Sequence, residues 1–404
     1  MEIRPILSAM SRNKTGALLI ALQIALTLAI VTNAAFIINE RSDFIARPTG
    51  LDDANTFIAV TTDFDRNLDS KQLILDDLEH INSMSGVKAA IVSHSIPVSG
   101  SGNGQTYQLA QDTPSNEAIN FGNFSVDVNG LEALDLELVA GRNFRPEEVT
   151  WRNFDFTAQQ KVVLVSQALA DELFPDESAL GKMIWQDETS EGPTEIIGIY
   201  DHMQNAWPGS TNVDRTSLQP FYDLTTTNRH FIVRTEPGER DRVMADVEAY
   251  LAQNRGRMID VIRSYEEQKQ RTYSSDIAMV KLLTGVVVIL TVVTSLGIVG
   301  LAWFSVSQRR KQIGTRRALG ATRFDIMRYF MVENWLITSI GLAIGIVATL
   351  TLNWFLDTEY QTGRMPLFYL PLGLLLLWVL GQLAVLAPAR RAANIPPALA
   401  TRSV

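Results

Sequence analysis

The sequence of 404 residues lacks cysteine altogether, which excludes disulfides and thiolate metal sites. It also lacks a Walker A motif, because Gly181-Lys182 has Asp176 where the motif needs glycine and no Ser or Thr follows. A Gly-x-Ser-x-Gly nucleophile motif is missing too. We therefore expect no catalytic residue, no cofactor bound by this chain, and no ATP hydrolysis by the P-loop route.

Histidine is scarce, and its pattern gives no sign of metal binding. None of the four histidines has a spacing typical of metal ligands, so we predict no metal site; they are His80, His94, His202 and His230. Two acid pairs, Asp76-Asp77 and Glu147-Glu148, stand among polar residues, and we interpret them as solvated surface. No basic face is left over that could bind nucleic acid.

Hydrophobic residues make up 46% of the chain, but they are unevenly distributed. Four apolar runs reach the roughly 20 residues that a membrane-spanning helix needs. We place these spans at residues 16–38, 276–307 (with a stalk at its start), 331–355 and 367–387. The first run is longer than the apolar core of a signal peptide and carries no charge, so we interpret it as a retained span.

The charges are segregated along the chain, which has 35 basic and 44 acidic residues and a formal net charge of −9. Three basic residues precede the first apolar run, seven lie between the second and third, and three follow the fourth. These segments hold only two acids, Glu2 and Asp325. Because basic segments stay on the cytoplasmic side of a membrane, we predict cytoplasmic placement for residues 1–15, 308–330 and 388–404.

Residues 39–275 and the short loop 356–366 then lie outside the cytoplasm. Apolar spacing predicts a strand, a helix and a strand at 56–60, 70–83 and 87–95. The same order returns in a second half, at 229–234, 240–254 and 258–264. A β-rich insert at about 113–225 separates the halves. The expected fold class is a membrane protein with four transmembrane helices and a large α+β extracytoplasmic domain between the first two.

The chain is predicted to be helical from Tyr265 into the second span, since no proline or glycine occurs before Gly285. One helix of about 40 residues would be about 60 Å long and would project beyond a hydrocarbon core of about 30 Å. Such a stalk would carry motion between the two sides of the membrane. The alternative is a helix that breaks near residue 275.

Five polar or small residues inside the spans are predicted to serve helix packing. Gln23 and Asn33 in the first span, and Glu333 at the edge of the third, need partners because polar groups are costly in lipid. Gly341 and Gly345 form a Gly-x-x-x-Gly close-packing pattern. We favour packing over transport of a proton or substrate for all five.

The basic segment 308–330 fixes the topology. Thr322, followed three residues later by Asp325, is a capping-box pattern that predicts a helix running into the third span. Gly314 and Gly320 divide the part before it, so we predict a short helix, a turn and a second helix at the membrane surface. Taken alone, these charges either only set the topology or also form a functional surface.

The run R-K-Q-I-G-T-R-R-A-L-G-A-T from Arg310 to Thr322 resembles R-x-E-I-G-I-R-R-A-L-G-A, the signature cytoplasmic loop of the FtsX/MacB family of ABC-transporter permeases. Gln312 stands where that family has an acid. Residues 388–399 resemble the closing P-A-R-R-A-A motif of the family, and residues 141–144, 162–175 and 180–182 resemble its periplasmic core domain. The resemblance is weakest at 99–120 and 201–228.

The resemblance implies a non-catalytic permease subunit in the bacterial inner membrane, with both termini cytoplasmic and the large domain periplasmic. The loop would dock on a separate ABC ATPase, which would hold ATP and magnesium. The residues implied in docking are Arg310, Lys311, Gln312, Ile313, Gly314, Arg316, Arg317, Leu319 and Gly320. Movement of the loop would reach the periplasmic domain by mechanotransmission.

The resemblance also implies partners. A second copy or a sister permease would complete the helix bundle, and a periplasmic adaptor with an outer-membrane channel would complete an efflux system. Three alternatives stay open: lipoprotein extraction, FtsX-like regulation of a cell-wall hydrolase, and a membrane sensor without an ATPase. Co-purified partners would distinguish these functions.

Overall fold

The computed structural model describes residues 14–65, 69–111, 117–153, 160–186, 192–254, 256–360 and 362–396. The chain divides into two compact units. We name residues 1–46 with 275–404 the helical unit, and residues 47–274 the α+β domain. Most of the predicted N-terminal segment 1–15, and the part of the predicted tail after residue 396, lie outside the described residues.

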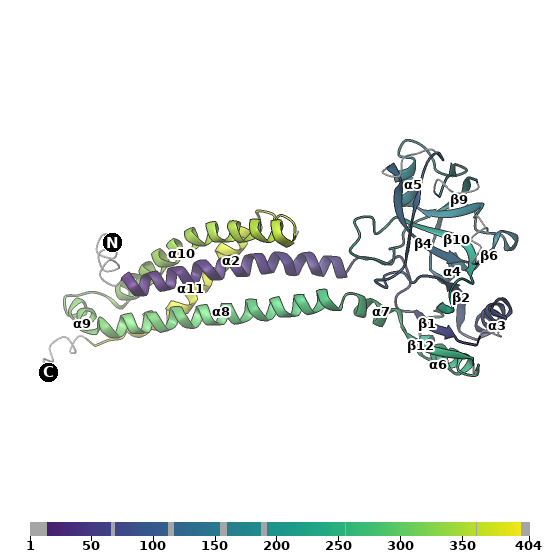
Figure 1. The fold of residues 1–404 in the computed structure, drawn as a ribbon. Helices are drawn as coiled ribbons and strands as arrows, with labels where there is room; N and C mark the ends of the chain where they lie inside the picture. The colour runs from purple at the N-terminus through teal and green to yellow at the C-terminus, as the bar shows by residue number, and fades with distance from the viewer. Residues whose placement is uncertain are drawn as a thin grey trace. The chain divides into compact units, whose positions relative to one another are not determined.

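The helical unit is built from five helices in its described part, drawn in Figure 1. They are α2 (Lys14–Ile45), α8 (Ser274–Gln308), α9 (Arg310–Ala318), α10 (Arg323–Tyr360) and α11 (Tyr369–Ala393). Over the described residues, α2, α8, α10 and α11 are long and apolar enough to cross a membrane. The fold class predicted from the apolar runs, with four spans, is confirmed.

Helix α10 packs closely against α2, and two glycines make this approach possible. A β-carbon at Gly341 would lie 2.7 Å from the carbonyl oxygen of Ala21, and one at Gly345 would lie 3.1 Å from Cα of Ala25. Without side chains at these two positions the backbones come close enough for extensive van der Waals contact, the main attraction between helices in lipid. The structure thus places both glycines of the pattern on the α2 side of α10.

Polar side chains tie α2 to its neighbours. The Gln23 side-chain amide donates to the carbonyl of Val293 in α8 at 3.2 Å. The Asn33 amide donates to Ala29 in its own helix at 2.9 Å and to Thr349 in α10 at 3.2 Å. Both predicted packing residues of α2 therefore contact a second helix.

The long helix predicted from Tyr265 onward is interrupted. Helix α7 (Tyr265–Thr272) ends at Tyr273, and α8 begins at Ser274. The Thr272 hydroxyl donates to the carbonyl of Val98 at 2.7 Å, and the Tyr273 hydroxyl donates to Oε1 of Gln204 at 3.4 Å. The continuous helix is wrong, and the alternative with a break holds, because these bonds hold the end of α7 on loops of the α+β domain.

In the α+β domain, two β-α-β halves interleave in one antiparallel sheet of order β12-β1-β11-β2. The elements are β1 (Thr56–Asp63), α3 (Ser70–Ser83), β2 (Val87–Ser93), β11 (Asn228–Thr235), α6 (Arg240–Leu251) and β12 (Arg257–Ser264). Apolar residues of α3 and α6, such as Ile74 and Val247, share a core with Phe57 and Phe231 of the sheet. This order is that of a split β-α-β unit.

The chain between β2 and β11 forms an eight-stranded sheet of order β3-β4-β10-β7-β9-β5, with β6 joined to β10 and β8 to β9. The strands are β3 (Asn103–Tyr107), β4 (Ile119–Val126), β5 (Leu138–Gly141), β6 (Thr150–Arg152), β7 (Val162–Ser166), β8 (Met183–Ile184), β9 (Thr194–Tyr200) and β10 (Thr216–Asp223). Three short helical elements accompany them: α4 (Gly130–Ala133), a 3-10 helix η2 (Pro146–Glu148) and α5 (Gln167–Leu173).

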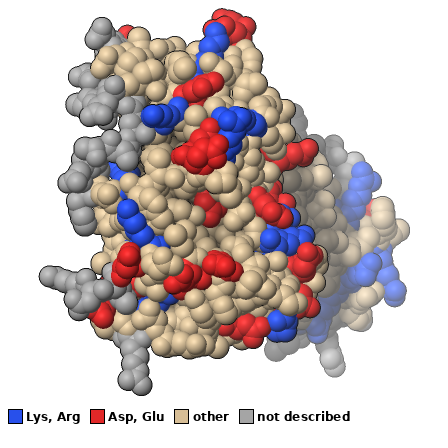
Figure 2. Space-filling model, turned by 90° about the vertical axis from the view of Figure 1, so that its right-hand side faces the viewer, with Lys and Arg blue, Asp and Glu red and all other residues tan. Residues whose placement is uncertain are grey.

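Figure 2 shows acidic and basic side chains interspersed on one face of the molecule. Surface ion pairs of the α+β domain follow this pattern; Arg242, for example, contacts both Glu239 and Asp246. Glu148, which we expected to be solvated surface, instead accepts two bonds from Arg142, at 2.6 and 2.8 Å. These bonds lower the pKa of the Glu148 carboxyl.

Candidate functional site

The basic segment folds into α9, a tight turn and the first part of α10. Gly320 has a φ of +99°, a conformation that glycine adopts without steric cost. The Gly320 amide donates to the carbonyl of Arg317, and the Ala321 amide donates to that of Arg316, at 3.2 and 3.1 Å. This pair of bonds is a Schellman motif, and it explains why α9 ends where the sequence places a glycine.

The capping box predicted at the start of the next helix is present. The Asp325 amide donates to the Thr322 hydroxyl oxygen at 3.1 Å, and the Thr322 amide donates to Oδ2 of Asp325 at 2.9 Å. From there α10 continues without interruption to Tyr360. The predicted short helix, turn and second helix that runs into the third span are therefore confirmed, and the second helix is the start of α10 itself.

Three arginines of this segment contact other helices of the helical unit. Nη1 of Arg309 lies 3.0 Å from both carboxylate oxygens of Glu333. The guanidinium of Arg316 lies over the Tyr329 ring, 4.9 Å from its centroid. These contacts fasten the end of α8 and the middle of α9 to α10.

The third arginine makes the link to α11. Nη1 of Arg317 donates to the carbonyl oxygen of Ala393, the last residue of that helix, at 2.7 Å. Ile313 and Gly314 lie buried on the same side of α9. Helix α9 is therefore packed along one side against the ends of α10 and α11.

The other side of the segment is open. The turn is flanked by two apolar side chains, Leu319 and Phe324, whose exposed fractions are 83% and 64%. The same segment exposes basic or polar side chains, and one acid, Asp325; the basic or polar ones are Arg310, Lys311, Gln312, Arg323 and Arg328. An exposed apolar pair with a basic rim is typical of a protein-binding surface, since the pair gains by burial and the rim selects an acidic partner.

The nine residues implied in docking are thus divided between two sides of the segment. Arg310, Lys311, Gln312, Leu319 and Gly320 are exposed. Ile313 and Gly314 are buried, and Arg317 donates a hydrogen bond to the end of α11. Arg316 is exposed, although its guanidinium lies over the Tyr329 ring. The sequence could not separate the two groups, because the basic residues look alike until their partners are known.

Sequence reasoning missed three residues of this site: Arg309, Phe324 and Tyr329. Arg309 and Glu333 are 24 positions apart on different helices, so no spacing rule joins them. Phe324 carries a signal that could have been used, because an aromatic residue among basic ones at a turn is unusual in a purely topological loop.

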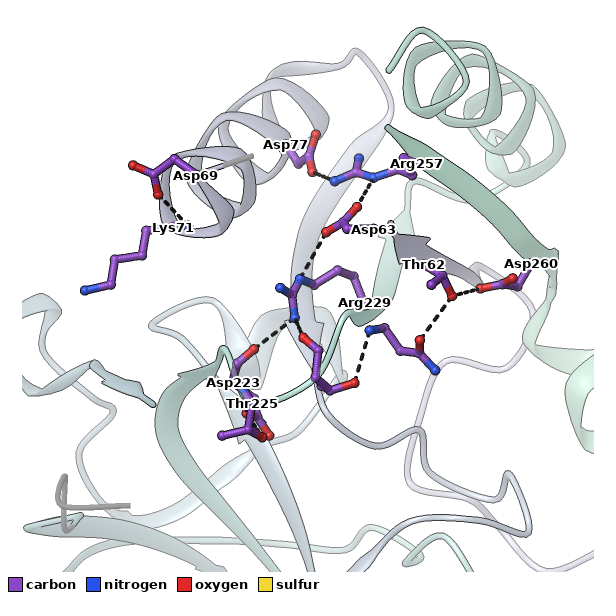
Figure 3. A network of polar contacts seen from close by, with 12 residues as sticks. Thr62, Asp63, Asp69, Lys71, Asp77, Asp223, Thr225, Arg229, Arg257 and Asp260 are labelled. Atoms are coloured by element: carbon purple, nitrogen blue, oxygen red, sulfur yellow. Dashed lines mark hydrogen bonds and ion pairs between the residues drawn. The ribbon is translucent and has the colours of Figure 1, made fainter. Parts of the chain in front are cut away.

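A second cluster of charges lies inside the α+β domain. Figure 3 shows Asp63 between the guanidinium groups of Arg257 and Arg229, with Asp77 on the far side of Arg257. Arg257 donates to Asp63 at 2.9 Å and to Asp77 at 2.7 Å, and Arg229 approaches Asp63 at 3.5 Å. All four side chains are at most 6% exposed. The cluster joins α3, β1, β11 and β12, so it ties both halves of the domain together.

The cluster corrects one of our expectations. Asp77 is buried, whereas we predicted that the Asp76-Asp77 pair is solvated surface. Burial raises the pKa of Asp77, and the bond and charge of Arg257 oppose that rise. The burial arises because Asp77 lies on the face of α3 that carries Ile74, Leu78 and Ile81. The cluster is enclosed by the domain, and its charged groups are paired with one another, although Oδ2 of Asp63 and Nε of Arg229 meet only as an ion pair at 3.5 Å without a hydrogen bond. We therefore assign it a structural role.

Four helices able to cross a membrane, an α+β domain inserted after the first of them, and a capped basic turn before the third form the arrangement expected from the resemblance to ABC-transporter permeases. The chain belongs to the family of MacB-like and FtsX-like permeases. Residues 17–250 match the family model of the MacB-like periplasmic core domain, and residues 284–397 match that of the FtsX-like permease C-terminal domain. The resemblance seen in the sequence is thereby confirmed.

Relatives of this chain include the macrolide export ATP-binding/permease protein MacB of Marinobacter nauticus. It is 25% identical over 366 residues, covering 89% of this chain and 52% of that protein. The protein of the same name from Campylobacter jejuni subsp. jejuni is 29% identical over 294 residues, covering 67% and 42%. The chain spans about half the length of the curated relatives it matches.

Part of the chain is also similar to solved structures. The periplasmic region of MacB from Actinobacillus actinomycetemcomitans gives a TM-score of 0.33 at 13% identity, covering 57% of this chain and 97% of that one. The extracellular domain of the noncanonic ABC-type transporter YknZ from Gram-positive bacteria gives 0.31 at 15% identity, covering 51% and 100%.

Proposed function

We propose that this chain is the permease subunit of an ABC transporter that works by mechanotransmission. The observation that carries the proposal is the two-sided construction of α9 and its turn. One side offers Leu319 and Phe324 with a basic rim, and the other is fastened to α10 and α11 by arginines. A surface built in this way binds a partner and transmits the movement of that partner to α10 and α11.

The partner in this proposal is an ABC ATPase, which binds ATP and magnesium. Its closure on ATP pulls or pushes α9. The Arg309–Glu333 pair transmits the displacement to α10, and the Arg317–Ala393 bond transmits it to α11. The end of α8 moves with Arg309, which follows α8 directly in the chain. No residue of this chain takes part in the hydrolysis.

The charge distribution supports a cytoplasmic position for the turn and for both termini, and a periplasmic position for the α+β domain. The chain then crosses the bacterial inner membrane four times. A second copy or a sister permease pairs with it, since the described helices of one chain leave many apolar side chains exposed, among them Val288, Val292 and Leu296 on α8.

Efflux is the transport function that we favour, with a periplasmic adaptor and an outer-membrane channel as further partners. The support is the similarity to proteins named for macrolide export, which covers most of this chain. Lipoprotein extraction and FtsX-like regulation of a cell-wall hydrolase use the same mechanical principle, so partner identity decides among the three.

The test is a pull-down of the tagged full chain in mild detergent, followed by mass spectrometry. We expect an ABC ATPase with the wild type and with Leu109→Asp, a control at an apolar residue of the α+β domain that is 51% exposed. The double variant Leu319→Asp/Phe324→Asp should recover about tenfold less ATPase or worse, because two charges enter the apolar contact. Recovery of equal amounts of ATPase with both variants would show that the turn is not the docking surface.

Charge reversal at Arg316 and Arg317 should also abolish ATPase association while the chain stays inserted. Both residues are packed on the helical unit, so this variant tests transmission and docking together. A co-purified adaptor supports efflux, and a co-purified hydrolase supports the signalling alternative. Recovery of the chain alone, even after cross-linking, would favour the ATPase-free sensor and contradict the proposal.

A further inference from the structure

The α+β domain contains a cavity of about 380 Å³ at the edge of its eight-stranded sheet. This volume lies within the range of about 300–1,000 Å³ typical of small-molecule sites. The floor is the β3–β4 hairpin, where Gly104 and Gly122 are directly opposed. The wall is the loop between β9 and β10, which contains Asn205 and Trp207.

The lining has an unusual chemical character for a small-molecule site. None of the described residues that line it is charged, and most carry an amide or a hydroxyl group. The side chains that we use in the argument are Thr106, Asn120, Trp207, Ser210 and Asn212. The amides of Asn120 and Asn212 make no side-chain hydrogen bond to another described residue, so both can donate to and accept from a ligand.

Trp207 provides an aromatic surface in this polar cavity. The six-membered ring of its indole lies 3.5 Å from the position that a β-carbon would take on Gly104. The side chain is only partly buried, so part of the ring faces the cavity that it lines, whereas the gap between the ring and the Gly104 backbone is filled by a single β-carbon. The face of an aromatic ring carries negative charge density and attracts the weakly positive C–H groups of a ring stacked on it.

The cavity is held rigidly by backbone bonds between two distant segments. The Val98 amide donates to Asn205 at 3.0 Å, and the Gly100 amide donates to Ala206 at 2.7 Å. The cavity lies in the parts of the chain, 99–120 and 201–228, where the sequence resembles the permease family least. A binding site that distinguishes this chain from its relatives is expected in segments whose sequence departs from the family motifs.

We propose that this cavity binds a neutral, hydroxyl-rich ligand, namely a sugar ring that stacks on Trp207. Amide and hydroxyl groups pair with sugar hydroxyls, each of which both donates and accepts, and the uncharged lining disfavours sialic or uronic acids, whose carboxylate would lose its hydration without gaining a counter-charge. The proposal goes beyond the coupling to an ATPase and does not depend on it.

The cavity also lies beside the end of α7. Val98 and Gln204, which accept the hydroxyl bonds of Thr272 and Tyr273, are next to the residues that hold the cavity wall. The Tyr265 hydroxyl donates to Pro97 at 3.0 Å in the same region. The wall of the cavity and the end of α7 are therefore held by the same two loop segments of the domain.

The test uses the full chain in lipid nanodiscs prepared without sugar detergents, applied to an array of neutral and acidic glycans. We expect binding to at least one neutral glycan, and a loss of about tenfold or more in affinity for that glycan with Trp207→Ala. Trp207→Phe should lose less because it keeps an aromatic face. Gln253→Ala, which deletes an exposed amide elsewhere on the domain, should bind as the wild type does.

Two further variants keep the test valid if Trp207→Ala fails to fold. Gly104→Val places branched methyl groups against the Trp207 ring, which a β-carbon alone already contacts at 3.5 Å, and Asn120→Ala removes an exposed amide from the lining. Both should weaken binding of the neutral glycan. Absence of binding to every neutral glycan, binding to acidic glycans alone, or binding that survives Gly104→Val unchanged would each overturn the proposal.

Discussion

The two units of the chain differ in how many charged side chains they bury. In the described part of the α+β domain, five aspartate and arginine side chains are buried: Asp63, Asp77, Asp127, Arg229 and Arg257. In the described part of the helical unit only Glu333 is, and its partner Arg309 sits at the end of α8. The domain buries ion pairs in its interior. Among the described residues of the helical unit, the most buried ion pair, Arg309–Glu333, lies next to the turn where the proposed partner binds, and pairs at the other helix ends, such as Arg41–Asp276, are more exposed.

The helical unit relies instead on neutral polar groups in its interior. The hydroxyls of Thr27 and Thr294 bond at 2.7 Å, and the Asn334 amide donates to the carbonyl of Gly381 at 3.0 Å. Such groups cost less to bury than charges and still connect helices in lipid. The Arg309–Glu333 pair is the exception, and its position between α8 and α10 makes it part of the transmission path.

Removal of Arg257 should produce the largest effect, because it leaves Asp63 and Asp77 buried without their partner. We expect Arg257→Met to destabilise the α+β domain by about 3–5 kcal/mol. Denaturant unfolding of the full chain, followed by limited proteolysis of the domain, measures this loss. Arg242→Met removes an arginine with two surface ion pairs and is the matched control, for which little change is expected. Equal effects of both variants would show that the cluster is no more important than surface pairs.

A side chain at Gly341 should open the contact between α2 and α10. Gly341→Val is expected to cost about 1–3 kcal/mol, because a β-carbon there meets the backbone of Ala21. Thermal unfolding in detergent gives the measure. Gly285→Val is the control, since nothing lies within 4 Å of a β-carbon at that position of α8. If Gly285→Val and Gly341→Val lose the same stability, the loss arises from the helix propensity of valine and not from the contact between α2 and α10.

The Arg309–Glu333 pair should be energetically coupled. In a double-mutant cycle of Arg309→Met and Glu333→Leu, we expect a coupling energy of about 0.5–3 kcal/mol, with the double variant more stable than the sum of the single ones predicts. The pair should also be required for ATPase activity to respond to the permease. Additive single effects would show that the two side chains stabilise the unit independently.

His94 should make the α+β domain sensitive to acid. Burial lowers the pKa of His94 from 6.5 to about 4, and its Nδ1 accepts a bond from the Ser125 amide, which requires the neutral ring. Since the pKa in the folded state lies below that in the unfolded state, stability is present above pH 6.5 and is lost as the pH falls toward about 4. His94→Gln should flatten this part of the stability profile measured by unfolding. A profile that keeps its full slope would assign the acid sensitivity to other groups.

Much of the fold was predictable because each signal is local. The apolar runs indicate the spans, the alternation of strand and helix residues indicates both halves of the α+β domain, and Thr322 with Asp325 indicates the start of α10. Gly320 likewise marks the end of α9. In each case the residues that determine the feature lie within a few positions of one another.

The features that escaped prediction depend on distant contacts. Tyr273 ends α7 because its neighbour Thr272 and its own hydroxyl bond to loops more than 60 positions away. Asp77 resembles its exposed neighbour Asp76 until Arg257 lies beside it. Arg316 and Arg317 look alike in the sequence, and only the structure places one over the Tyr329 ring and the other at the end of α11.

The central claim is that the open side of the α9–α10 turn binds an ABC ATPase. The most direct measurement is site-specific photo-cross-linking in intact cells, with the photoreactive residue at Leu319 and, as a control, at Leu109 of the α+β domain. The account predicts a cross-link between position 319 and an ABC ATPase, and none from position 109. A chain that yields no ATPase adduct from position 319, or equal adducts from both positions, would contradict it.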